Sequence, residues 1–248
     1  MKWYLKPYAE MDFWRWVTTW SISARKPSDL NYSDHLHHLP KLHEITTIVT
    51  NEKPLSRNGQ MSMFNFPAVN FHEIKKEVRN TIEKRCEKAV NITNKKDISV
   101  YWVNLNDEAS LLKQYDKTAI EIKGQMSIDQ KEDILTSFSK GDIKKLITKP
   151  TITSFGLNWQ HCNHSVYFPT FSYEQYYQAI RRFWRFGQKK EVFIDLIISD
   201  GQQRILESLL AKKQKAIEMF QNLTDHANSI YKIQKKEFNQ PILKPKFI

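Results

Sequence analysis

The sequence predicts an α/β protein built on a parallel sheet with helices on both faces, and three observations support this. From about residue 97 onward, short apolar runs alternate with longer amphipathic ones, as in strand–helix–strand units. The strand-like runs are mainly apolar, which is typical of strands buried on both faces. The chain has 248 residues, of which 40% are hydrophobic, and this is enough to build one large core.

The predicted elements follow one another regularly from residue 97. Strands are expected at 98–104, 119–122, 144–149, 164–169 and 191–199. Helices are expected at 107–115, 127–141, 173–186 and 202–223. The second of these helices begins at Ser127, a good N-cap, and ends at Gly141, which favours the left-handed conformation of a helix terminus.

The first 96 residues differ from the rest in composition and in the pattern of apolar residues. Residues 1–40 hold four of the seven tryptophans, and a helix is expected around Trp14–Trp20, stopped by Pro27. Exposed aromatic residues in such number favour a segment that packs on another surface. Residues 41–96 contain a strand-like run at 43–50 and a charged helix at 71–90. The predicted organisation is therefore 1–40, 41–96, 97–220, and a basic C-terminal helix and tail at 221–248.

Charge and cysteine content narrow the class of protein. The formal net charge is +11 and the isoelectric point about 9.4, which favours a polyanionic partner such as DNA or RNA, although a solvated basic surface is the simpler alternative. Two cysteines, Cys86 and Cys162, are too few for a disulfide framework. The N-terminal residues lack the apolar stretch of a secretory signal, and no apolar run reaches membrane-spanning length. A cytoplasmic protein without a membrane partner is expected.

The stretch QAIRRFWRFGQ at 178–188 concentrates positive charge on a short segment. If it is helical, Gln178, Arg181, Arg182 and Arg185 share one stripe. Arginine keeps its charge and binds phosphate oxygens in pairs, so this stripe suits the phosphates of a nucleotide. On spacing alone, a solvated face or one that binds a nucleic-acid backbone explains it equally well.

This stretch resembles the last motif of superfamily 2 helicases, and its closing FGQ is similar to that of the Swi/Snf-like branch. Upstream, LITKPTITSFGLNWQHCN resembles the preceding helicase motif, with Gly156, Leu157 and Asn158 on its core positions. Residues 100–112 and 122–150 are similar to the motif before that and the helix behind it, and 199–220 to the closing helix. Residues 2–30 resemble the segment between the lobes of phage-borne DEAD/DEAH-type helicases; their sequence is KWYLKPYAEMDFWRWVTTWSISARKPSDL.

The resemblance implies the second RecA-like lobe of an ATP-dependent DNA helicase or translocase. Arg182 and Arg185 would be the catalytic arginines that reach the nucleotide, with Gln178 and Gly156 close to it. Leu157, Asn158 and Arg181 would lie near the nucleic acid, and duplex DNA is the partner that the branch implies. The family pattern has glycine or aspartate at position 181, so Arg181 leaves open which arginine faces phosphate. A phage or prophage protein in the host cytoplasm is implied as well.

The phosphate-holding half of an ATP site is missing from the sequence. None of the six glycines is followed by lysine, so the chain has no P-loop. ATP and Mg²⁺ are therefore expected only in an intact enzyme completed by a P-loop lobe, and the chain alone is expected to be inactive. Asp107 and Glu108 follow a strand, but the helix dipole accounts for carboxylates in a first helical turn, and we do not expect them to bind Mg²⁺.

Other candidates are weaker. His35, His37, His38 and His43, and the group His161, Cys162 and His164, lack the paired spacing of a zinc site, so no metal site is expected. Cys162 is expected to be buried and unreactive. Three alternatives to half an ATPase stay open: a nucleic-acid-binding lobe without enzymatic activity, a subunit that completes a P-loop protein in trans, and an inactive remnant of a larger gene.

Overall fold

The computed structural model describes residues 6–21, 24–30, 32–35, 37–50, 56–57, 60–61, 71–152 and 157–231. The chain divides into two compact units. The larger one comprises Leu39–Lys213, and the smaller one combines Met1–His38 with Gln214–Ile248.

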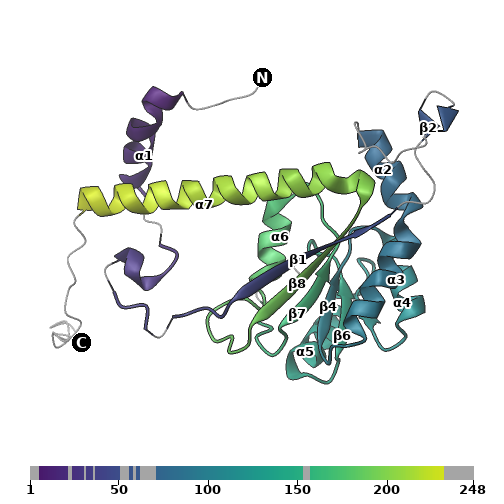
Figure 1. The fold of residues 1–248 in the computed structure, drawn as a ribbon. Coiled ribbons are helices and arrows are strands. Elements are labelled where there is room, and N and C mark those ends of the chain that lie inside the picture. Colours follow the sequence, from purple (N-terminus) through teal and green to yellow (C-terminus); the bar gives the residue numbers. More distant parts are fainter. Residues whose placement is uncertain are drawn as a thin grey trace. The chain divides into compact units, whose positions relative to one another are not determined.

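The larger unit is built on a six-stranded sheet in which every neighbouring pair of strands is parallel (Figure 1). Across the sheet the order is β1-β8-β7-β4-β6-β5. The strands are β1 (Leu42–Val49), β4 (Ser99–Trp102), β5 (Ile120–Glu121), β6 (Lys145–Thr148), β7 (His164–Tyr167) and β8 (Val192–Ser199). The predicted parallel sheet is confirmed. A separate antiparallel pair joins β2 (Ser56–Arg57) to β3 (Gln60–Met61).

Helices cover both faces of the sheet, as predicted. One face packs against α3 (Ile82–Thr93) and α4 (Asn106–Tyr115), which share a buried cluster with Tyr101 and Val103. The other packs against α5 (Ile128–Lys140), α6 (Tyr173–Ile180) and the first turns of α7 (Gln203–Tyr231). Strand residues alternate between the two clusters, so most positions of the strands carry an apolar residue.

Two helical predictions can be compared with the structure closely. The Ser127 hydroxyl accepts the N–H of Gln130 and Gly141 ends α5 at a φ of 88°, as expected from the sequence. The single helix predicted at 71–90 is wrong, because it divides at Thr81 into α2 (Phe71–Asn80) and α3. The Thr81 hydroxyl donates to the carbonyl of Glu77 at 2.8 Å and accepts from Arg85, which stabilises the break.

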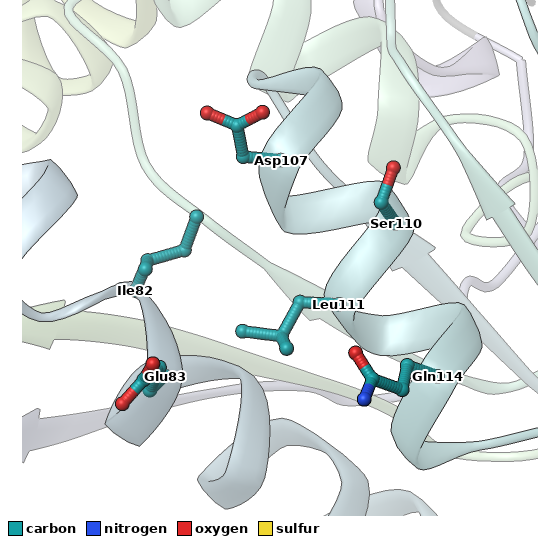
Figure 2. Close-up of a pocket in the computed structure, with 6 residues that line it drawn as sticks. All are labelled: Ile82, Glu83, Asp107, Ser110, Leu111 and Gln114. Carbon is teal, nitrogen blue, oxygen red and sulfur yellow. The ribbon is translucent and has the colours of Figure 1, made fainter.

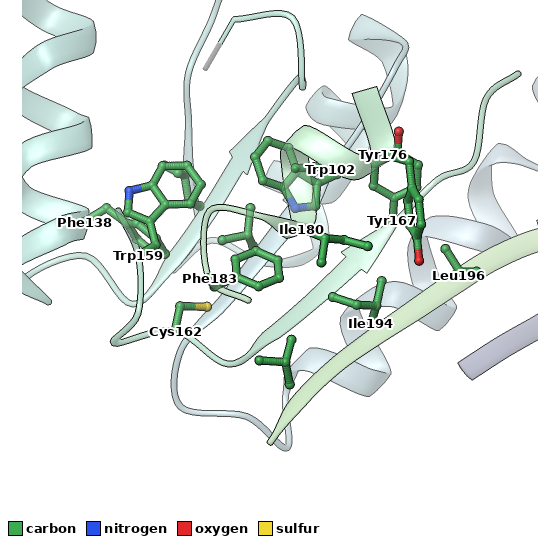
Figure 3. Packing of buried hydrophobic residues seen from close by; sticks show 14 of the residues in the cluster. Trp102, Phe138, Trp159, Cys162, Tyr167, Tyr176, Ile180, Phe183, Ile194 and Leu196 are labelled. Carbon is green, nitrogen blue, oxygen red and sulfur yellow. The ribbon is translucent and has the colours of Figure 1, made fainter. Parts of the chain in front are cut away.

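The core beneath α5 and α6 is rich in aromatic residues (Figure 3). The Trp159 ring stacks on Trp102 at 5.8 Å between centroids and meets the edge of Phe138 at 5.1 Å. Trp159 and Phe183 are fully buried. Side chains of this size fix the position of the segments around them, because interiors are close-packed.

The smaller unit contains the aromatic helix α1 (Glu10–Thr18), two short 3-10 helices (Pro7–Ala9 and Pro27–Leu30) and the second half of α7. α1 ends before Pro27, which starts the second 3-10 helix. Trp16 and Trp20 contact each other at 5.6 Å and remain 60% and 65% exposed. Within the part of the chain that the structure describes, we find no helix long and apolar enough to cross a membrane.

Candidate functional site

The helix that carries the arginine-rich stretch ends earlier than the sequence predicts. α6 stops at Ile180, and residues 181–188 form a turn-rich segment, the arginine loop, in which Gly187 has a φ of 91°. The carbonyl of Arg182 accepts the N–H of Trp159 at 2.8 Å, and the carbonyl of Phe183 accepts the side-chain amide of Gln188 at 3.1 Å. These partners lie outside a helical ladder, so the predicted helix to residue 186 and its single polar stripe are wrong.

Arg182 is buried in this loop, with an exposed fraction of 6%. Its guanidinium carbon lies 5.4 Å from the centre of the Trp159 ring, a cation–π distance. Burial, and then the charge of Arg185, lower the pKa of Arg182 to about 10, so it is still charged at neutral pH. Among the described residues, no carboxylate forms an ion pair with this guanidinium. A buried charge in this position would be stabilised by an anion.

Arg185 lies on the exposed side of the same loop. Its guanidinium donates a hydrogen bond to the side-chain oxygen of Asn158. Asn158 is also exposed, whereas Leu157 before it is half-buried and packs against the core beneath α6. The structure thus brings together two motifs that the sequence singled out, the one that contains Arg185 and the one that contains Asn158. Gly156 lies outside the described residues.

The other two candidates are placed differently. The Gln178 side chain is exposed on α6 and donates to Glu174 of the same helix at 3.2 Å. The Arg181 guanidinium lies over the rings of Tyr177 and Trp184, at 5.2 and 4.7 Å. Its buried Nε has no hydrogen-bond partner among the described residues. Within the described part of the chain, the side-chain contacts of Gln178 and Arg181 do not reach Arg182, Arg185 or Asn158.

Two residues that shape the site have no role in the sequence-based prediction. The ring of Trp159 lies against the Arg182 guanidinium, and the backbone N–H of Trp159 donates a hydrogen bond to the carbonyl of Arg182. Gln188, which is 6% exposed, donates its amide to the carbonyls of both Cys162 and Phe183. The glutamine that closes the FGQ motif was the available signal for Gln188. A tryptophan in a loop gives no such signal, because core packing is its commoner role.

The remaining titratable candidates have structural partners. Burial raises the pKa of Cys162 to about 12, so the thiol is unreactive at neutral pH, as expected. His164 binds Ser99 at 2.9 Å and Asp195 at 2.8 Å in the interior. Within the described ranges, no three His, Cys, Asp or Glu side chains gather in a group that could hold a metal ion.

A pocket of about 300 Å³ lies between α3 and α4, on the face of the sheet opposite α6 (Figure 2). Its lining residues are Ile82, Glu83, Asp107, Ser110, Leu111 and Gln114. Glu108, the neighbour of Asp107, is buried and paired with Arg85 at 2.8 Å, and it also caps the N–H groups of Asn104 and Leu105. Because it lies on the opposite face of the sheet, the pocket is separate from the arginine loop. The contacts of Glu108 give this carboxylate a structural role in addition to its interaction with the helix dipole.

Comparison with known proteins places this geometry in context. The family model of the helicase conserved C-terminal domain matches residues 60–187, slightly more than half of the chain. One similar structure is the C-terminal part of the Fun30 ATPase domain, with 18% identity and a TM-score of 0.46 over 57% of this chain and 48% of that one. Another is the E. coli DEAD-box protein SrmB, solved with the regulator of ribonuclease activity A, with 14% identity and a TM-score of 0.44 over 52% and 78%. The chain spans about half of the Fun30 structure. No curated protein matches it.

Proposed function

Because the chain belongs to the helicase conserved C-terminal domain family, we propose that it is the second lobe of an ATP-dependent DNA helicase or translocase. ATP and Mg²⁺ would bind between this lobe and a first lobe that carries the P-loop, within the same protein or in trans. The closing FGQ motif favours the Swi/Snf-like branch and hence duplex DNA. The resemblance of the N-terminal segment to phage-borne helicases favours a phage or prophage origin.

The burial of Arg182 without a carboxylate partner is the observation that carries this proposal. Most buried arginines pair with an acid, because an unpaired buried charge is costly. Arg182 keeps its charge at neutral pH and rests on Trp159 rather than on an acid. The terminal phosphate of ATP is an anion that fits such a guanidinium, and its charge grows more diffuse over the oxygens during transfer. The residues present therefore fit the phosphate side of a nucleotide.

Arg185 and Asn158 extend the same site toward solvent. The guanidinium of Arg185 has more donors than its bond to Asn158 occupies, so it can contact phosphate while Asn158 orients it. We assign Arg182 and Arg185 to the nucleotide, with Gln178 and Gly156 near it. When bound, ATP with Mg²⁺ supplies the phosphoryl transfer that drives the movement of the lobes. The P-loop lobe would hold Mg²⁺ and the inner phosphates.

We assign the nucleic-acid contacts to Leu157, Asn158 and Arg181. Asn158 is exposed and bonded to Arg185, so DNA bound at Asn158 would influence the arginine and link the two ligands. Arg181 is the least favoured of the three, because it stacks on Tyr177 and Trp184 and would have to leave these rings to reach DNA.

The test is phosphate release in the presence of DNA and Mg²⁺, by the chain alone and by the complete two-lobe protein. We expect negligible turnover by the chain alone and DNA-stimulated turnover by the complete protein. Arg182→Ala and Arg185→Ala should each lower kcat by about 10³-fold, the lower end for arginines of this kind. Turnover by the chain alone that survives both substitutions would overturn the proposal. DNA binding that ATP never affects would favour a lobe without enzymatic activity, and a broad melt would favour an inactive remnant.

A further inference from the structure

The amino-terminal edge of the sheet carries a row of lysines. All six strands are parallel, so their first residues lie at the same edge (Figure 1). Lysines stand just before four of the strands, namely β1, β8, β4 and β6. These residues are Lys41, Lys189, Lys190, Lys95, Lys96 and Lys144, and we refer to them as the lysine edge.

The charge of the lysine edge is not neutralised within the described part of the chain. All six lysines are exposed, and none of them takes part in an ion pair there. Lys96 lies over the ring of Phe193 at 5.2 Å, which leaves its charge available. Among the described residues just before these strands, the exposed carboxylates are Asp97, Asp142 and Glu191, and Glu191 is already bonded to His43 at 3.0 Å. The edge therefore presents a net positive field.

The lysine edge is continuous with the arginine loop. β7 is the strand between β8 and β4, and the segment that leads into it contains Trp159 and His161. The ring of His161 contacts Phe138, which packs on Trp159 beneath Arg182. Burial lowers the pKa of His161, a hydrogen bond with the backbone of Phe138 opposes this effect, and the positive charge of Lys144 lowers the pKa further. Lysines thus flank the arginine site on both sides along one edge.

The length of this edge suits a polyanion better than a single small anion. Neighbouring strands are about 4.8 Å apart, so the edge from β1 to β6 is roughly 19 Å long. Duplex DNA laid along it would carry about 11 phosphate charges, at one charge for each 1.7 Å or so of its axis. Separate lysines spread over that distance match a backbone in which charges repeat.

We propose that the lysine edge is a second nucleic-acid contact of this lobe, which binds the phosphate backbone of duplex DNA independently of its sequence. The inference rests on the proposed function for the identity of the polyanion. It adds residues that the helicase motifs do not include, and it makes the contact electrostatic. Binding at this edge should weaken steeply as salt is raised.

The experiment measures the affinity of the full chain for a short fluorescent duplex DNA by anisotropy, over a series of salt concentrations. Two charge-reversed variants are compared, Lys95→Glu with Lys96→Glu, and Lys189→Glu with Lys190→Glu. The matched control is Lys76→Glu with Lys88→Glu, which reverses two exposed lysines of α2 and α3 away from the edge. Near about 0.1 M salt, each edge pair should weaken binding about tenfold and the control less than about twofold. Each edge pair should also reduce the slope of log affinity against log salt by about 2.

Other outcomes overturn the inference. Equal weakening by all three pairs would mean that only net charge matters, and no weakening by the edge pairs would mean that DNA binds elsewhere. The native chain could fail to bind DNA but bind an acidic P-loop lobe. If the edge variants abolished that binding, the edge would be assigned to a protein partner. The side chains of Lys189 and Lys190 form no hydrogen bond or ion pair with the described residues, so this pair keeps the test valid if the Lys96 variant unfolds. The ATPase test of Arg182 and Arg185 is independent of all these results.

Discussion

The guanidinium of Arg185 donates a hydrogen bond to the side chain of Asn158, which lies 27 positions earlier in the chain. The two residues come from different sequence motifs and are both exposed. Their contact joins the segment that we assign to DNA to the one that we assign to the nucleotide. A short path of this kind is a physical means by which DNA could affect hydrolysis.

Asn158→Ala removes the acceptor that orients Arg185. We expect kcat of the two-lobe protein to fall about tenfold, because misplacement of a positioned group is costly to catalysis. The free energy of unfolding should change by less than about 0.5 kcal/mol, since the site is exposed. Steady-state ATPase and urea unfolding measure the two effects. The matched control is Asn163→Ala, a half-buried asparagine that donates to the carbonyl of Glu191 at 2.8 Å. Equal kcat losses in both variants would contradict the assignment.

Arg182→Met should stabilise the isolated chain while it disables the two-lobe enzyme. Replacing a buried charge that has no carboxylate partner by an apolar side chain is expected to add about 1 kcal/mol. Because the pKa of Arg182 in the folded chain, about 10, is below the ordinary value, the charge of Arg182 lowers the free energy of unfolding. This destabilisation is fully present below pH 10 and disappears only at higher pH.

The control for this prediction is Arg85→Met, a second buried arginine with the opposite environment. Arg85 is paired with Glu108 at 2.8 Å, and both side chains are at most 2% exposed. Loss of Arg85 leaves an uncompensated carboxylate and should cost about 3 to 5 kcal/mol. Urea unfolding of both variants should give changes of opposite sign. Destabilisation by Arg182→Met of the same size as by Arg85→Met would show that Arg182 has a structural partner.

Gln188→Ala should loosen the arginine loop. The Gln188 amide donates to the carbonyls of Cys162 and Phe183 at 3.0 and 3.1 Å, in a buried position. Two buried carbonyls would lose their partner, at a cost of about 2 kcal/mol in urea unfolding. Gln160→Ala is the control, since half-buried Gln160 donates a single bond of 3.2 Å to the carbonyl of the exposed Phe186. It should cost less than about 0.5 kcal/mol.

Asp116→Asn should reduce stability at neutral pH and much less in acid. Burial works to raise the pKa of Asp116, but hydrogen bonds from Thr118, Lys145 and Tyr101 outweigh it and hold the pKa below its ordinary value. The ionised carboxyl therefore stabilises the fold above pH 4 or so, and this contribution is lost as pH falls through the lowered folded pKa. Urea unfolding at neutral and acid pH should show a difference from the native chain of about 2 kcal/mol that shrinks in acid. Asp133→Asn, at an exposed position of α5, should show no such trend.

Local patterns in the sequence were sufficient for the fold class of the larger unit and for most of its strands, but not for the order of the strands in the sheet. Strands that read as mainly apolar runs are buried on both faces. Ser127 caps the start of α5 and Gly141 caps its end, because capping and left-handed backbone depend on the residues themselves. The residue types of the site were available in the same way, since arginine, asparagine and glutamine stand in recognisable motifs.

Only the tertiary structure decided how those residues are used. The sequence from Tyr173 to Phe186 has the composition of one helix, but α6 ends at Ile180 because the carbonyls of Arg182 and Phe183 find partners in Trp159 and Gln188. That break buries Arg182 on Trp159 and turns Arg185 toward Asn158. Hydrogen bonds between distant segments outweigh a local helical preference of a few tenths of a kcal/mol per residue, and periodicity within one segment contains no information about them.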